Sequence, residues 1–274
     1  MMTNNDRLKT LLGYSIPSII AMILSTTMTL TDGYFVGNYV GEKALASINL
    51  GLPILYLYLG LGLCIGVGGS VISGQLIGGK DRDKASSVFT ESIVTALAIT
   101  LLLSAGVYLL FNPILRLLKA EGELSVFFKS YYRVMLFSYP LLVLTTIFGM
   151  FIRTDGRPQV FMGISLLESV LNFILDYVFL KKLNMGVKGS AYATLIVKVV
   201  SCTICILYFL FSSKSIKIKR FSFDCAVFQQ SMLNGSSEFI GEMAGAISMM
   251  ALNYVLMKYV GEGGVAAFTI LGFA

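Results

Sequence analysis

The amino-acid sequence predicts an all-α integral membrane protein built from two repeats of six helices. Apolar residues make up 56% of the chain, charged residues 13%, and the mean hydropathy is +0.80, a balance that ordinary soluble domains do not show. Residues 34–46 (YFVGNYVGEKALA) recur as residues 254–266 (YVLMKYVGEGGVA) at a constant offset of 220 positions. A repeat of that length predicts about 440 residues for an intact protein. We therefore expect the 274 residues to hold one whole repeat and a truncated second one.

Apolar stretches long enough to cross a bilayer define the predicted helices in order along the chain. Arg7 and Lys9 precede the first stretch, which continues without a signal-peptide cleavage site and is expected to remain as a helix. The seven predicted spans are 11–36, 49–74, 88–111, 132–151, 160–180, 189–211 and 232–259, and an eighth begins near Gly264. The charged loop 112–130 between the third and fourth spans is predicted to form a short interfacial helix.

Three segments follow from the repeat. Residues 1–211 form a complete six-helix lobe, residues 212–224 form a basic linker, and residues 225–274 begin a second lobe. Six spans is an even number, so both lobes enter the membrane from the same side and face a central cavity. A small excess of Lys and Arg in the loops on the side of the N-terminus, including the linker, predicts that this side is cytoplasmic.

The charge and the cysteine content exclude several functions. The net charge is +6, but the basic residues lie in short loops beside apolar spans, where they meet anionic lipid, so we expect membrane lipid and not nucleic acid as the partner. Four cysteines lie in or beside spans, and the chain contains no histidine to complete a metal-binding set. No metal site of that kind and no cofactor are expected.

Four polar residues are predicted to share one layer of the first lobe. Asp32 and Asp176 each lie four residues before the end of a span on the side opposite the N-terminus, about 6 Å below that surface. Thr194 lies five residues into the next span from the same surface. Asn172 is one helical turn from Asp176 on the same face.

This layer suits a proton or a sodium ion. Two neighbouring carboxylates in a medium of low dielectric constant repel each other, so one of them tends to hold a proton, and a sodium ion would accept the same oxygens as ligands. Ionisable groups inside membrane spans are usually functional. The alternative is a set of unrelated hydrogen bonds between helices, which Asn and Thr often make in membranes.

Other polar residues inside the spans allow simpler interpretations. Glu168 and Lys198 are predicted to form a structural ion pair, because unpaired charges at that depth would be costly. Glu238 and Glu242, one turn apart near the inner end of the seventh span, could contact a cationic solute or could instead reach toward water. Pro17 precedes Asp32 in the first span and could act as a hinge, although a static kink is the simpler reading.

Several motifs together resemble the multidrug and toxic compound extrusion (MATE) family, in particular its DinF-like and MepA-like branch. They are Pro17 followed by TDGYFVGNYVGEKALA, then IRTDGRPQ (152–159), LNFILDYVFL (171–180), GVKGSAYAT (186–194) and NGSSEF at the start of the seventh span. The resemblance covers the whole chain, and its specificity comes from the order and spacing of the motifs.

The resemblance implies a fold of two six-helix lobes and alternating access driven by entry of sodium ions or protons. In that branch an acid on the first helix, an Asn-x3-Asp pair on the fifth and a Thr on the sixth form the cation site of the N-terminal lobe. The matching positions are Asp32, Asn172, Asp176 and Thr194, the four residues that depth also groups together. The chain lacks the positions of helices 8 to 12, so we expect it to be truncated at its C-terminus.

The resulting hypothesis is a secondary active antiporter, not an enzyme, that exports amphipathic and often cationic drugs in exchange for H⁺ or Na⁺. It would lie as a monomer in the bacterial cytoplasmic membrane with its N-terminus in the cytoplasm. A flippase for lipid-linked saccharides is the alternative, but it should show several basic residues within its spans, and away from the span ends only Lys198 is basic. An intramembrane protease that uses Asp32 and Asp176 lacks the expected Gly-x-Gly-Asp setting.

Overall fold

The computed structural model describes residues 4–117, 122–219, 223–261, 263–264 and 267–268. Its helices, from the N-terminus, are α1 (Asn4–Tyr39), α2 (Glu42–Leu50), α3 (Leu52–Gly78), α4 (Arg82–Leu109), α5 (Phe111–Leu117), α6 (Gly122–Thr154), α7 (Pro158–Asp176), the π-helix η1 (Tyr177–Lys182), α8 (Val187–Leu207), the π-helix η2 (Tyr208–Ser212) and α9 (Cys225–Tyr259). Within these residues the secondary structure is helical, as predicted.

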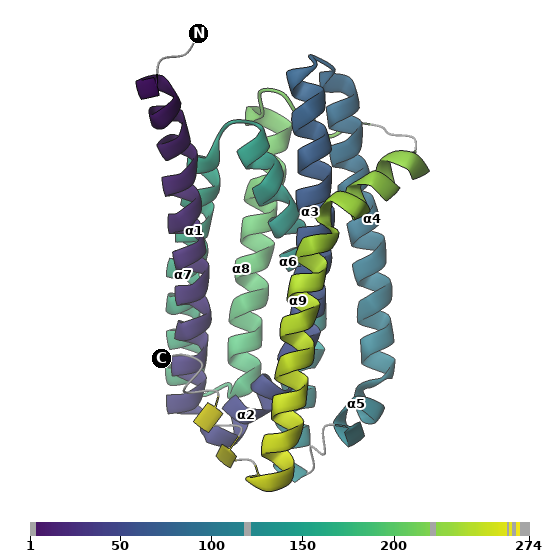
Figure 1. Cartoon of the computed structure of the whole chain (residues 1–274). Helices are drawn as coiled ribbons and strands as arrows, with labels where there is room; N and C mark the ends of the chain where they lie inside the picture. The colour runs from purple at the N-terminus through teal and green to yellow at the C-terminus, as the bar shows by residue number, and fades with distance from the viewer. Residues whose placement is uncertain (1–3, 118–121, 220–222, 262, 265–266, 269–274) are drawn as a thin grey trace.

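The described residues contain seven helical segments that are long and apolar enough to cross a membrane. These seven segments correspond to the seven predicted spans, and Figure 1 shows them side by side as one bundle. Every long helix reverses the direction of the one before it, so the ends of α1 and α7 and the beginning of α8 meet at the end of the bundle that carries α2. The chain is therefore a multi-pass membrane protein.

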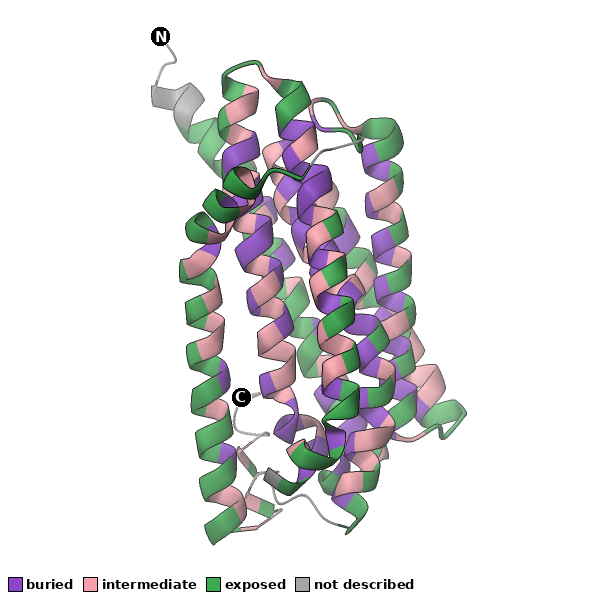
Figure 2. Cartoon of the chain, turned by 90° about the vertical axis from the view of Figure 1, so that its right-hand side faces the viewer, coloured by how far each residue is buried: buried purple, intermediate pink, exposed green. Residues whose placement is uncertain are grey.

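Helix α6 is the centre of the first six-helix group. The largest share of buried residues among the seven spans belongs to α6, and it packs against α3, α4 and α8. Aromatic side chains fill the space between these helices: Phe89 of α4 lies 4.8 Å from Phe151 and 4.2 Å from Phe209, measured between ring centroids. Figure 2 shows buried residues gathered on the inner faces and exposed residues on the outer faces of the bundle.

Several predicted boundaries were wrong. The segment after α1 forms the additional short helix α2, so α3 begins at Leu52. The predicted interfacial helix 112–130 is divided: Phe111–Leu117 forms α5, and α6 already begins at Gly122, ten residues before the predicted fourth span. The cause is that polar residues such as Glu123 and Lys129 alternate there with the buried Leu124 and Phe128, so a hydropathy window does not detect this first part of the helix. Lys119 and Glu121 of that predicted helix fall outside the described residues, as does most of the predicted eighth span.

The linker is docked on the first helix group. Asp155, at the end of α6, accepts hydrogen bonds from the Tyr208 hydroxyl (2.6 Å) and from the backbone N–H groups of Lys214 (3.0 Å) and Ser215 (2.7 Å). Farther along, the backbone N–H of Lys219 donates to Thr90 Oγ1 at 3.1 Å. Arg220, one of the predicted linker residues, is outside the described residues. The described part of the linker is thus held along α4 by hydrogen bonds that its basic composition did not predict.

Helix α9 crosses α3 at very short range. A Cβ atom added at Gly235 would lie 1.9 Å from the carbonyl oxygen of Cys64, and one added at Gly68 would lie 1.8 Å from the carbonyl oxygen of Ser231. Only glycine permits this approach of two backbones. The crossing places α9 against the first helix group along the cavity described next.

Candidate functional site

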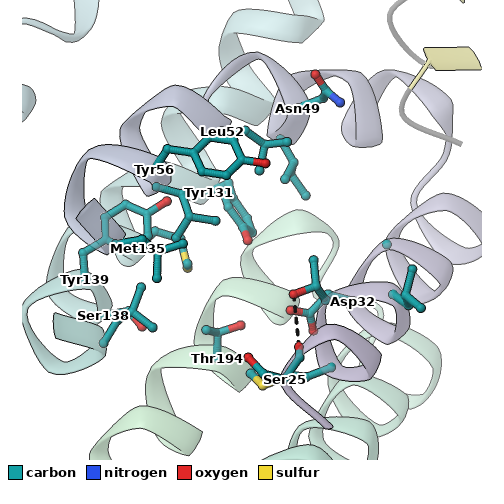
Figure 3. A pocket seen from close by; sticks show the side chains of 18 of the residues that line it. Ser25, Asp32, Asn49, Leu52, Tyr56, Tyr131, Met135, Ser138, Tyr139 and Thr194 are labelled. Carbon is teal, nitrogen blue, oxygen red and sulfur yellow. Dashed lines mark hydrogen bonds between the residues drawn. The ribbon is translucent and has the colours of Figure 1, made fainter. Parts of the chain in front are cut away.

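A cavity of about 410 Å³ opens beside α1, and most of its lining is apolar. Its described lining comes from α1, α2, α3, α6, α8, α9 and the segment after α9, and includes Ser25, Met28, Asp32, Asn49, Leu52, Tyr56, Tyr131, Met135, Ser138, Tyr139, Thr194, Lys198, Met249 and Phe268. Figure 3 shows Asp32 and Thr194 on one side of this cavity and Tyr131, Tyr139 and Met135 on the other. A volume of this size suits a small organic molecule.

The structure brings the four predicted cation-site residues together. Asp32 on α1 and Thr194 on α8 line the cavity, whereas Asn172 and Asp176 on α7 are fully buried behind them. Asp32 is close enough to interact directly with both Asp176 and Asn172. The layer deduced from depth in the spans is therefore a real cluster formed by three helices.

Two contacts fix α1 against α7 at this layer. The Ser169 hydroxyl of α7 donates to the carbonyl oxygen of Leu24 at 2.9 Å. About three turns farther along α1, the Phe35 ring packs edge-on against Phe173 with 5.4 Å between centroids. Asp32 lies between these two contacts along α1, on the helix pair that they hold together.

Most polar side-chain atoms of the cluster lack a hydrogen-bond partner. Asp32 Oδ1, both carboxyl oxygens of Asp176, both side-chain polar atoms of Asn172 and Thr194 Oγ1 are buried without a hydrogen bond of normal geometry to any described residue. A buried polar atom without a partner costs about 1 to 3 kcal/mol, and more if it is charged. Oxygens that converge from three helices in this state can bind a proton or a small hard cation.

A π-helix follows directly after Asp176. In η1 the hydrogen bonds reach five residues back, as in the 3.0 Å bond from the Leu183 N–H to the Val178 carbonyl. Short π-helical segments loosen the regular backbone pairing and are frequent at functional sites. The sequence did not predict this π-helix, because the residues that follow Asp176 are ordinary apolar ones that carry no π-helix signal.

The predicted ion pair between Glu168 and Lys198 is confirmed. Lys198 Nζ lies 3.0 Å from Glu168 Oε1, and both side chains are about one-tenth exposed. Lys198 also lines the cavity. It is the one basic side chain among the described residues of that lining, so the described lining does not contain the cluster of basic residues that a pyrophosphate group would require.

The two acids of α9 lie elsewhere than predicted. Because α9 begins at Cys225 and not at Met232, Glu238 and Glu242 lie near the middle of a long helix and not near its end. Glu238 is exposed, and Glu242 is half-buried where its Cβ packs beside Gly60 of α3. Neither acid belongs to the described cavity lining, although Tyr56, which lines it, interacts electrostatically with Glu242. Their contact with a substrate stays a prediction.

Pro17 is buried within α1, which continues through it as a single helix. The fifteen residues between Pro17 and Asp32 correspond to about 22 Å along the helix axis. The hinge stays a prediction.

Three polar residues of the site were missed by the sequence reasoning. Tyr131 and Tyr139 of α6 line the cavity opposite Asp32. Ser190, one turn before Thr194 on α8, is fully buried, and its hydroxyl has no described hydrogen-bond partner. The four-residue spacing between Ser190 and Thr194 could have indicated that both face the same layer. The position of the tyrosines could not have been deduced, because apolar residues occupy every face of α6 and do not indicate which face lines the cavity.

Comparison with known proteins gives one consistent result. The MatE family model matches residues 17–178. The multidrug export protein MepA of Staphylococcus aureus (strain NCTC 8325 / PS 47) is 29% identical over 265 residues, which cover 96% of this chain and 58% of MepA. The chain therefore spans somewhat more than half the length of that relative.

Solved structures give the same result. An inward-facing multidrug resistance MATE family transporter of the MOP superfamily has a TM-score of 0.86 at 28% identity, with 95% of this chain and 60% of that chain covered. An outward-facing MATE transporter of the same superfamily has a TM-score of 0.83 at 28% identity, with 97% and 62% covered. The family match extends over more than half of the chain, and it includes the helices that carry Asp32, Asn172 and Asp176. The chain belongs to the MatE family, as the motifs of its sequence suggested.

Proposed function

We propose that the protein is a secondary active multidrug exporter, an antiporter that moves amphipathic, often cationic compounds out of a bacterial cytoplasm in exchange for H⁺ or Na⁺. The observation that carries this proposal is the cluster of Asp32, Asn172, Asp176 and Thr194, whose unpaired buried oxygens lie directly beside a mainly apolar cavity of about 410 Å³. Membership of a family that contains multidrug export proteins supports it.

The proposed cycle uses the adjacency of the two sites. The cavity, lined by aromatic, aliphatic and methionine side chains, would accept drugs of varied shape, because such side chains repack easily. Binding of a proton or a sodium ion at Asp32 and Asp176 would change the charge of the cavity wall that the drug contacts. A cation that binds one access state more tightly than the other then shifts the equilibrium between them.

The arrangement in the membrane belongs to the same proposal. Residues 1–211 would form the N-terminal lobe, residues 212–224 the cytoplasmic linker and residues 225–274 the beginning of a second lobe. The N-terminus would lie in the cytoplasm, the protein would act as a monomer, and Pro17 would allow α1 to bend when the cation binds. No cofactor other than the coupling ion is proposed.

The test is efflux of a fluorescent cationic dye by the complete protein reconstituted in vesicles, under either a sodium or a proton gradient. Asp32→Asn and Asp176→Asn should each abolish gradient-driven efflux, since the amide cannot exchange a proton and binds sodium weakly. Asp83→Asn is the matched control, because Asp83 lies at an exposed ion pair with Lys219 away from the cavity. Efflux without either gradient, or equal efflux in all three variants, would contradict the proposal.

A further inference from the structure

The Glu168–Lys198 ion pair lies directly below the candidate cation site. Glu168 is four residues before Asn172 on α7, and Lys198 is four residues after Thr194 on α8. A spacing of four residues places the two layers about 6 Å apart in the same seam between α7 and α8. The ion pair and the candidate cation site are therefore one helical turn apart on both α7 and α8.

The ammonium group of Lys198 has access to both layers. Its Nζ lies 3.0 Å from Glu168, Lys198 itself lines the cavity, and its charge interacts with Asp32 on α1. Among the described residues, the other ionisable side chains near these groups are Asp176 of α7, Tyr131 of α6, which also lines the cavity, and Cys205 of α8. A lysine side chain is a compact charge on a flexible four-carbon stem, so a movement of one helical turn is within its reach.

The charges of the two layers do not balance in the absence of a bound cation. The carboxyl groups of Asp32 and Asp176 are close enough to interact and have no basic partner of their own among the described residues, whereas Glu168 has Lys198. Loss of a bound proton or sodium ion would leave both carboxylates charged in a medium of low dielectric constant, which is strongly unfavourable. The nearest source of compensating charge among the described residues is Lys198.

We infer that Lys198 is a tethered counter-cation, which moves toward Asp32 and Asp176 when the coupling cation leaves and is held away by Glu168 when the cation is bound. This inference rests on the proposed cation site. Lys198 would then compete with the external cation for the same carboxylates, and Glu168 would set the strength of that competition. Both residues are positioning residues: they determine how tightly the site binds its cation without being its ligands.

The inference predicts shifts of opposite sign. In Glu168→Gln the freed Lys198 competes more strongly, so the cation concentration for half-maximal binding should rise about tenfold for one unit charge displaced over several ångströms. In Lys198→Met the competitor is lost and Glu168 adds a negative charge, so that concentration should fall about tenfold. The double variant should return to within about threefold of the wild-type value, and Lys198→Arg, which keeps the charge, should remain close to it.

The experiment measures the thermal unfolding midpoint of the complete, purified protein in detergent against Na⁺ concentration at constant pH, and against pH without Na⁺. The half-saturation point is read from whichever cation stabilises the wild type. Asp83→Asn and Lys219→Met are matched controls, because they make the same charge changes at an exposed ion pair away from the cavity. These controls should leave the half-saturation point unchanged.

A merely structural ion pair would give a different result. Both single variants would then unfold at lower temperature with no change in half-saturation, and that outcome, or a shift of the same sign in both, would overturn the inference. If Glu168→Gln does not fold, a fall in half-saturation for Lys198→Met that Lys198→Arg does not show still supports it. A wild-type protein that responds to neither cation would overturn the proposed cation site itself, whereas a wild-type response without opposite shifts would overturn only the role of Lys198.

Discussion

Helices α1 and α9 occupy equivalent positions of the sequence repeat, 220 residues apart, and each ends in a turn of the same type. Gly41 follows α1 with φ of 115°, and Gly261 follows α9 with φ of 82°. The Gly41 N–H donates to the carbonyl of Val36 at 3.0 Å, and the Gly261 N–H donates to the carbonyl of Leu256, the equivalent position, also at 3.0 Å. The local geometry of the two copies thus agrees with the repetition of their sequence.

The two copies also contribute equivalent positions to one cavity. Thr29 of the first copy and Met249 of the second are equivalent, as are Ile48 and Phe268, and all four line the cavity. The chemistry of the copies differs, however, because the position equivalent to Asp32 is Leu252. The repeat thus preserves the turn and several positions of the cavity wall, while the described part of the second copy carries no acid at the position of Asp32.

The test with the largest expected effect replaces Asp32 of the first copy by leucine, the residue at the equivalent position of the second copy. Asp32→Leu should reduce cation-driven dye efflux by about 100-fold or more, since it removes the group through which cation binding would be coupled to transport. Adding Leu252→Asp should not restore it, because α7, which carries Asn172 and Asp176, packs against α1 and would still lack its acid partner there. Efflux assays in vesicles measure both. Recovery of transport in the double variant would show that the two copies are interchangeable, contrary to the comparison.

The two copies also differ in packing, because α9 approaches the backbone of α3 through Gly235. Gly235→Ala forces a methyl group against the backbone of Cys64 and should destabilise the protein by about 1 to 3 kcal/mol through overpacking. Gly241→Ala on the same helix is the control, because a Cβ there would meet nothing within 4 Å. Thermal unfolding in detergent measures both. The equivalent position in α1 is Ser15, which already carries a side chain. If Gly235→Ala were tolerated without loss of stability, glycine would not be required at this position of α9 and the two copies would not differ in this respect.

The linker between the copies offers a third test. Asp155→Asn weakens charge-assisted hydrogen bonds to the linker backbone, which are worth about 1.5 to 3 kcal/mol each when a charged group takes part. Local opening should increase, and tryptic cleavage after Lys214 and Lys217 should be about tenfold faster. The rate of limited proteolysis measures this effect. Asp83→Asn, which removes only an exposed ion pair with Lys219, should leave cleavage at these two lysines nearly unchanged; equal acceleration in both variants would mean that Asp155 does not hold the linker.

The smallest expected effect concerns the shared turn. Gly41→Ala and Gly261→Ala should each destabilise the protein by about 1 kcal/mol, because alanine disfavours the positive φ that both turns require. Thermal unfolding midpoints should fall by similar amounts in the two variants. Gly13→Ala, within α1 and with open space around a Cβ, is the control and should not destabilise. A large difference between Gly41→Ala and Gly261→Ala would show that only one of the turns is structurally important.

Much of the candidate site was predictable from position alone. Asp32, Asp176 and Thr194 were assigned to one layer by counting residues from the ends of apolar spans, and the structure places them together because helices have a constant rise per residue. The Glu168–Lys198 ion pair followed from the high energy of unpaired charge in a membrane. Such arguments succeed when the bilayer fixes where each helix begins and ends.

The sequence by itself determined the fold class, the seven described spans, the repeated turn and the layer of polar residues, because hydropathy and helical spacing are local properties. Only the tertiary structure decided that Tyr131 and Tyr139 face Asp32 across the cavity, that η1 follows Asp176, and that Asp155 anchors the linker. These features depend on the rotation of each helix about its axis. Apolar spans that are hydrophobic on every side carry no signal for that rotation, so side-chain packing between helices determines it.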